Sequence, residues 1–301
     1  MVWITDLGPS AVQVHHRLRG GALCDRRPCI TGSPEPLVPQ VEETPATARE
    51  PTWFGSGGQA LGLIPGTSLT PDQHDLASAL MSGHHPRTGR LRPAAARRSR
   101  GLELTVTQPA SLSALYALAE QDQAAAIEAL VAQAVGEAAA QLEQWITPAS
   151  RHAGLLGWIL WHRTAPAAGS GVPRPCLHAH LVIATLMRDG GGRWTDMSRH
   201  RRRALHEHAG VMELYARARV RQLLSAQQQV RWERDALTGV WEVAGIAPAL
   251  RTLFAHPSSP RTQRGPDSTA RPSRRGAKVP LAALAQRAKP VAAGIGDGHS
   301  R

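Results

Sequence analysis

The stretch CLHAHLVIATL (176–186) is apolar except for two histidines, His178 and His180, which stand two residues apart. Its length and its aliphatic and β-branched content favour a buried strand. Side chains alternate between the two faces of a strand, so residues two apart share a face. The sequence therefore predicts two imidazoles side by side on one face of a sheet.

A second apolar run, LLGWILWHR (155–163), precedes this stretch and has His162 near its end. The Gly/Pro-rich segment APAAGSGVPRP joins the two runs, which favours an antiparallel pair. Pairing brings His162 towards the other two histidines, and three neutral imidazoles suit a divalent metal while leaving coordination positions open. The alternative is accidental, because the chain has 14 histidines and a His-x-His pair also occurs as ordinary core or surface residues.

Further elements flank this pair. LELTVTQ (102–108) alternates as a strand does and stops at Pro109, and residues 111–146 have helical spacing, with Ser111 as a plausible N-cap. Residues 198–226 predict a basic helix, and RWERDALTGVWEVAG (231–245) predicts a hairpin that turns at Thr238–Gly239. This mixture indicates an α+β fold with an antiparallel sheet.

The two ends of the chain differ from its middle. Residues 17–52 hold Pro, Gly and Arg without a sustained period, and residues 257–301 are rich in Ser, Pro, Arg and Gly. Such compositions predict loop or disordered structure. We therefore expect a degenerate N-terminal segment (1–52), one domain (53–256) and a disordered basic tail (257–301).

The chain of 301 residues carries a net charge of +12, with a pI of about 11.2. This balance favours a polyanionic partner, although arginines scattered over solvated faces would give the same total. Three cysteines are too few for a disulfide framework, and neither a signal peptide nor a run long enough for a membrane helix is found. We expect a cytoplasmic protein, and the lack of a phosphate-binding-loop motif argues against an ATP motor.

Six segments, in this order along the chain, resemble the MobF/TrwC-type conjugative relaxases, which belong to the histidine–hydrophobic–histidine endonucleases. Among the family patterns are W-x-G, P-x-TG, DLTFSAPKSVS, LH-x-H and DGRW. The segments are WFGSGGQALGL (53–63), HPRTGRLRP (85–93), RGLELTVTQPASLSALYAL (100–118), WHRTA (161–165) with PCLHAHLVIATL (175–186), GGRWTDM (191–197) and WEVAGIAPALRTLFAHPSSPR (241–261).

The resemblance implies a palm-like antiparallel sheet with packed helices. It makes His162, His178 and His180 the ligands of Mg²⁺, Mn²⁺ or a similar ion, and it places Glu103 where the family has an aspartate that supports the site. It implies nicking of single-stranded DNA at a transfer origin during plasmid conjugation or mobilisation, alongside other relaxosome proteins. In the family, an N-terminal tyrosine attacks the scissile phosphate.

That tyrosine is not found, because the chain has only Tyr116 and Tyr215, both on predicted helices and both expected to pack in the core. His15 and His16 stand where the family has its tyrosine pair, so His16 is a candidate nucleophile, with two solvated histidines as the alternative. Ala110 also replaces the lysine of KSVS. Three functions stay open: a relaxase-type transesterase, an inactive single-strand DNA-binding remnant, and a metal-dependent hydrolase that uses water.

Single-strand DNA grooves combine positive charge with aromatic stacking. The candidate DNA contacts are arginines in the basic run before residue 102 and at the start of the 198–226 helix, with solvated arginines as the alternative for each. The tryptophans are expected mainly in the core. The candidate arginines are Arg87, Arg90, Arg100, Arg201 and Arg202, and the tryptophans are Trp53, Trp145, Trp158, Trp161, Trp194, Trp232 and Trp241.

Overall fold

The computed structural model describes residues 3–6, 50–81, 83–90, 101–147, 154–165, 174–189 and 191–254. Most of the predicted N-terminal loop region and the whole predicted tail lie outside the described residues, as do the candidates His16 and Arg100.

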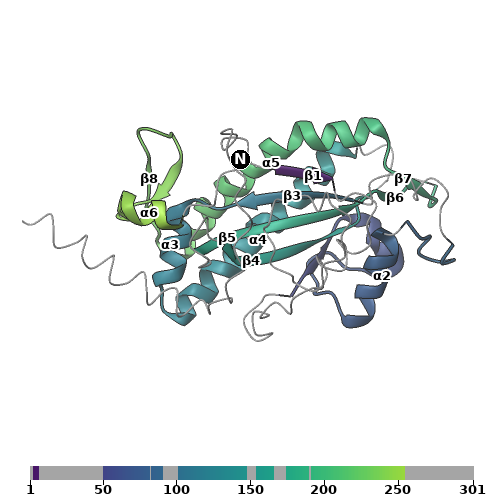
Figure 1. Cartoon of the computed structure of the whole chain (residues 1–301), viewed down its shortest axis with the longest axis horizontal. Helices are drawn as coiled ribbons and strands as arrows, with labels where there is room; N and C mark the ends of the chain where they lie inside the picture. Colours follow the sequence, from purple (N-terminus) through teal and green to yellow (C-terminus); the bar gives the residue numbers. More distant parts are fainter. Residues whose placement is uncertain are drawn as a thin grey trace, which may run out of the picture.

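A five-stranded antiparallel sheet forms the centre of the molecule (Figure 1). This confirms the predicted α+β class. It also confirms that the two histidine-bearing strands, β4 and β5, pair with each other, and they form the most extensive contact between any two strands of the sheet. The N-terminal strand β1 is part of this sheet and pairs with β3. The strand order is β1 (Trp3–Asp6), β3 (Gly101–Thr107), β5 (Arg174–Ala184), β4 (Gly157–Ala165) and β2 (Thr52–Phe54).

Helices α3 (Ala110–Leu118), α4 (Gln121–Ile146) and α5 (Arg199–Gln228) pack their apolar residues against one face of the sheet. Leu104 and Leu181 project from this face into the larger hydrophobic cluster and are fully buried. Burying a side chain of this size contributes about 1.5–3 kcal/mol, so this layer fixes the strands in place.

The opposite face carries a second, smaller cluster. Trp158, Leu160 and Val182 project from β4 and β5 and pack with residues of α2 (Pro71–Met81). Because the histidines have the same strand parity as these residues, they project from this second face. The candidate metal ligands therefore lie on the side of the sheet away from the long helices.

The 3-10 helix η1 (Ser56–Leu61), which overlaps the glycine-rich WFGSGG segment, packs against the residues just before β4. A Cβ on Gly57 would lie 2.6 Å from the carbonyl oxygen of Gly154, so only glycine permits this approach. The carboxylate of Glu143 accepts hydrogen bonds from the backbone N–H of Ser56 (3.0 Å) and of Leu155 (2.6 Å). Glu143 of α4 thus links η1 to the residues just before β4, the strand that carries His162.

Two small hairpins extend from opposite ends of the sheet (Figure 1). One comprises β6 (Leu186–Arg188) and β7 (Trp194–Asp196), and the other comprises β8 (Trp232–Arg234) and β9 (Trp241–Val243). Gly239 has a φ of 68° in the β8–β9 turn, which confirms the turn predicted there. Helix α6 (Pro248–Phe254) follows β9 and packs on α3.

Three predictions about single residues are wrong. Ser111 does not cap α3: Pro109 is at the N-cap, and the buried Ser111 hydroxyl accepts a hydrogen bond from the Val243 N–H at 2.7 Å. Tyr215 and Trp241, expected in the core, are 38% and 41% exposed: Tyr215 packs at the margin of the α4–α5 contact against Trp145, and Trp241 of the β8–β9 hairpin packs under Arg221. Trp53, Trp158 and Trp194 are buried, as predicted.

Among the described helices, none combines the length and the apolar character that crossing a bilayer requires.

Candidate metal centre

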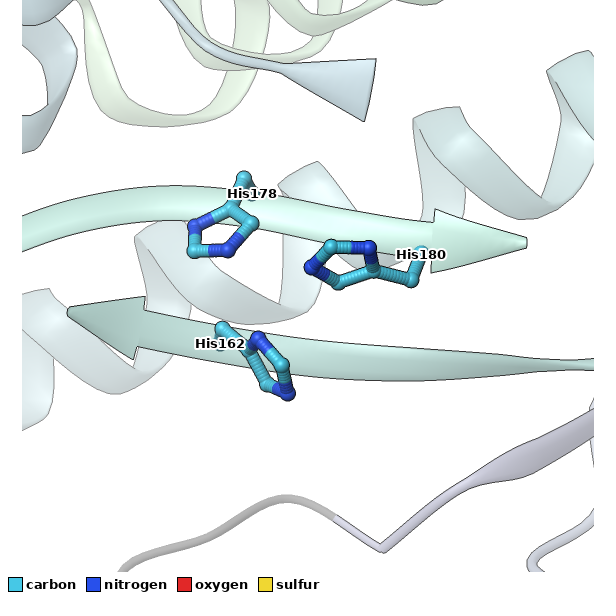
Figure 2. Close-up of side chains that lie close together, drawn as sticks. All are labelled: His162, His178 and His180. Carbon is cyan, nitrogen blue, oxygen red and sulfur yellow. The ribbon is translucent and has the colours of Figure 1, made fainter. Parts of the chain in front are cut away.

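His162, His178 and His180 converge on one point of the sheet (Figure 2). His162 pairs directly with His178 across β4 and β5, and His180 projects from the same face of β5. The ring centroids form a nearly equilateral triangle with sides of 5.1, 4.7 and 5.0 Å, and one ligand nitrogen from each ring lies within 4.8 Å of the others. The predicted triad is therefore assembled.

Hydrogen bonds hold two of the rings in one orientation. The Nδ1–H of His178 donates to the carbonyl oxygen of Cys176 at 2.9 Å, because a carbonyl can only accept. The Nδ1–H of His180 donates to the Glu103 carboxylate at 2.6 Å, and Thr105 Oγ1 lies 3.2 Å from the same nitrogen. In the neutral form of both rings Nε2 then carries the lone pair that binds a metal.

The site is shielded from solvent, since the three histidines and Glu103 are each at most 5% exposed. Three imidazoles backed by a carbonyl and a carboxylate are a donor set typical of divalent transition metals. The residues therefore fit a metal ion. Glu103, which has one methylene more than the family's aspartate, still reaches the histidine, because its carboxylate contacts His180 directly.

Neither tyrosine lies at this centre. The Tyr116 hydroxyl donates to the Glu128 carboxylate of α4 at 3.1 Å, and Arg163 binds the same carboxylate at 2.9 Å. Glu128 belongs to the helical layer on the opposite side of the sheet from the imidazoles. Tyr215 packs edge-on against Trp145 of α4, also in the helical layer. The sheet thus separates both phenols from the triad.

The predicted DNA contacts Arg87 and Arg201 both border the β6–β7 hairpin. Arg87 lines a pocket of about 330 Å³ together with His85, Gly192, Arg193 and Trp194. Arg201, at the start of α5, approaches the Met187 sulfur at 3.5 Å. Arg90 is exposed at the end of the turn that carries Arg87, and Arg202 is half-buried beside Arg201.

Asp189 shapes the wall of this pocket. Its carboxylate accepts hydrogen bonds from the N–H of Arg193 (2.9 Å) and of Gly191 (3.0 Å) and pairs with the Arg193 guanidinium. The backbone N–H of Arg193 is the main cause that holds the pKa of Asp189 below its ordinary value. A charged Asp189 therefore keeps the turn closed and Arg193 beside the pocket.

The sequence reasoning missed Thr105, Arg193 and the Cys176 carbonyl as parts of these sites. Thr105 had a usable signal, because it stands two residues after Glu103 on a predicted strand and so shares its face. The carbonyl contact had none, because it depends on the orientation of one imidazole ring.

The fold is similar to solved structures of a conjugative relaxase. A metal-free structure of conjugative relaxase TrwC in complex with oriT DNA matches with a TM-score of 0.64 at 17% identity, covering 98% of this chain and 99% of that chain. A metal-bound structure of the same complex matches with a TM-score of 0.62 at 18% identity and the same coverage. TrwC complexed with a 27-mer DNA that comprises the recognition hairpin and the cleavage site matches at 0.58 and 19%, covering 82% and 91%.

No curated protein sequence matches the chain. The TrwC relaxase family model does, over residues 43–289, which is well over half of the chain and includes the histidine triad, Glu103 and the β6–β7 pocket. The chain therefore belongs to the TrwC relaxase family.

Proposed function

We propose that this protein is a metal-dependent single-strand DNA nicking transesterase of plasmid conjugation or mobilisation. The convergence of three buried imidazoles on one face of the sheet carries the proposal, because this donor set suits a divalent ion with open positions. Mg²⁺, Mn²⁺ or a similar ion would be held by His162, His178 and His180. When bound, such an ion supplies charge that polarises a phosphate and stabilises the transition state.

The protein's own residues would keep the site ready for that ion. Glu103 fixes the tautomer of His180, and the Cys176 carbonyl does the same for His178. The three histidines and Glu103 are nearly fully buried, and this shielding from water would strengthen electrostatic interactions at the site. The substrate would be single-stranded DNA at a transfer origin. The protein would act in the cytoplasm, together with other relaxosome proteins.

We assign the DNA-binding surface to the region around the β6–β7 hairpin. Arg87 and Arg193 supply positive charge to the pocket, and the mostly buried Trp194 presents part of its surface to it. Positive charge beside an aromatic ring is the usual arrangement for a single strand. Arg90, Arg100, Arg201 and Arg202 would extend this surface.

The boundaries of the domain are also a proposal. We assign the relaxase-like unit to residues 53–256, with the segment 1–52 contributing β1 to its sheet and the basic tail 257–301 following it. His16 stays a predicted nucleophile.

The second candidate function is a single-strand DNA-binding remnant that has lost nicking. The positions of Tyr116 and Tyr215 favour it, because both phenols lie in the helical layer on the far side of the sheet from the triad. In this case the metal site and the basic surface would persist without strand cleavage.

Incubating the protein and Mn²⁺ with a labelled single-stranded DNA hairpin distinguishes these functions. Cleavage with a label that stays on the denatured protein supports the transesterase, and mass spectrometry of that adduct identifies the nucleophile. Binding without cleavage supports the remnant. Cleavage without any adduct supports a hydrolase that uses water, and the absence of both binding and cleavage contradicts all three functions.

A further inference from the structure

Arg217 of α5 reaches the end of β3. Its Nε–H donates to the carbonyl oxygen of Thr107 at 3.1 Å, and its Nη2 donates to the Thr107 hydroxyl at 3.1 Å. Nη2 also contacts the Glu213 carboxylate at 2.7 Å. The helix packs on one face of the sheet, and this side chain meets β3 two residues beyond Thr105, the last β3 residue that pairs with the described part of β1.

The hydroxyl that Arg217 holds is on the metal-binding face. Thr105 Oγ1 lies 3.2 Å from the His180 ring, which shows that this strand parity faces the triad. Thr107 stands two residues further along β3 and so shares that face. It also pairs directly with His178 across the sheet. The guanidinium is therefore anchored beside the triad, although its helix belongs to the other layer.

The contacts of Arg217 fix its position without using all of its donors. Within the described residues, no hydrogen bond involves Nη1, whereas Nε and Nη2 are both occupied. The side chain is 18% exposed and Glu213 is 6% exposed, so the pair is held against the protein. A guanidinium that is already oriented loses less entropy when it binds an anion.

From this geometry we propose that Arg217 binds a backbone phosphate of the single strand next to the histidine triad, with Thr107 and Glu213 as its positioning residues. The proposal rests on the proposed function, because it takes single-stranded DNA as the ligand. Guanidinium groups bind phosphate oxygens through strong charge-assisted hydrogen bonds, and an oriented donor at a reacting phosphate serves both binding and catalysis.

The test measures the affinity of the full chain for a short fluorescein-labelled single-stranded oligonucleotide, with divalent ions removed by a chelator, over a range of salt concentrations. The variants are Arg217→Gln, Arg217→Lys and the control Arg219→Gln. Arg219 lies on the same helix but pairs with Glu137 of α4 and not with the end of β3. Thermal unfolding and metal content of each variant show whether the fold and the triad are intact.

We expect Arg217→Gln to weaken binding about tenfold, as the loss of one charge-assisted phosphate contact does. The slope of log K against log salt should become shallower by about 0.7, the value for one phosphate contact on a single strand. Arg217→Lys should keep the slope and lose part of the affinity, and Arg219→Gln should match the unaltered protein.

Unchanged affinity and slope in Arg217→Gln would overturn the inference while leaving the proposed function in place. A second result would also overturn it: Arg217→Gln loses affinity together with its metal or with a lowered melting temperature, while the salt slope stays unchanged. That result would show that Arg217 only stabilises the fold and does not contact the DNA. If the unaltered protein fails to bind any single strand, the proposed function and this inference both fail.

Discussion

At the scale of single residues, the histidine triad depends on two strands that pair in one register. We predict that replacing both His178 and His180 by alanine abolishes uptake of a divalent ion, because one imidazole alone cannot hold it. Metal content measured by mass spectrometry tests this, with His206→Ala, an exposed histidine of α5, as the control. Unchanged metal content in the double variant would reject the triad as the binding site.

Glu103 joins β3 to the candidate metal centre through its hydrogen bond to His180. We predict that Glu103→Ala lowers metal affinity about 10–100-fold, because it removes the carboxylate that orients His180 and raises its basicity. Glu103→Gln, which keeps an acceptor without the charge, should lose less. Competition against a chelating dye measures the effect, and Glu120→Ala, exposed and without a capping bond, should have none. Equal affinity in Glu103→Ala and the unaltered protein would show that Glu103 does not act on the metal.

Much of the triad could be predicted because it follows from periodicity. Two histidines at spacing two share a face of a strand, and a third on the preceding strand meets them once the pair is antiparallel. Glu103 followed from family resemblance. Arg217 could not be predicted, because a long side chain that reaches from a helix to the end of a strand leaves no pattern in the sequence. Tyr215 was misplaced for a related reason, because helical spacing does not show which side of a helix the sheet covers.

At the scale of elements, the β8–β9 hairpin holds the start of α3, which follows the strand carrying Glu103. Ser111 Oγ accepts the Val243 N–H, and Glu242 accepts the Ser111 N–H at 3.1 Å. We predict that Ser111→Ala lowers the free energy of unfolding by about 1–3 kcal/mol, because it leaves a buried N–H without its acceptor. Denaturant unfolding measures this, and Ser68→Ala, at an exposed position, should change stability by no more than about 0.5 kcal/mol. Equal losses in the two variants would contradict the docking role.

Helices α4 and α5 are joined by the pair of Glu137 and Arg219, at 2.5 Å. The hydrogen bond from Arg219 lowers the pKa of Glu137. A lowered carboxyl pKa in the folded state gives stability above the unfolded pKa of about 4.3, and that stability is lost as the pH falls through the lower, folded value. We predict that Glu137→Gln costs about 0.5 kcal/mol at neutral pH, as a solvent-screened pair does. The difference from the unaltered protein should vanish towards pH 2 in denaturant titrations, and a constant difference would reject the pair as its cause.

The sequence predicted the type of most elements because each has a clear period and clear ends, as LELTVTQ does before Pro109. It did not predict the role of Ser111. A serine near the start of an apolar helical run has the sequence signature of an N-cap, yet the chain turns at Pro109 and the hydroxyl serves a hairpin more than a hundred residues away. The role of the Ser111 hydroxyl is set by a tertiary contact, and local sequence propensity carries no information about such contacts.

At the scale of the whole molecule, the sheet divides the protein into a face that provides stability and a face suited to chemistry. The long helices bury one face, and the other face holds the imidazoles, with α2 packed on its far part (Figure 1). Arg217 and the start of α5 bring positive charge from the helical layer towards the second face and the β6–β7 hairpin.

This arrangement predicts a strong dependence of DNA binding on salt. If four or five arginines contact phosphates, the slope of log K against log salt for a single strand should be about −3, since each contact contributes about −0.7. Affinity should then fall about 60-fold between about 50 and 200 mM salt, which fluorescence anisotropy with a labelled single strand measures. Substituting Gln at both Arg87 and Arg201 should make the slope shallower by about 1.4, because both side chains border the β6–β7 hairpin. A flat salt response in the unaltered protein would show that its arginines are only a solvated surface and that the charge has no part in binding DNA.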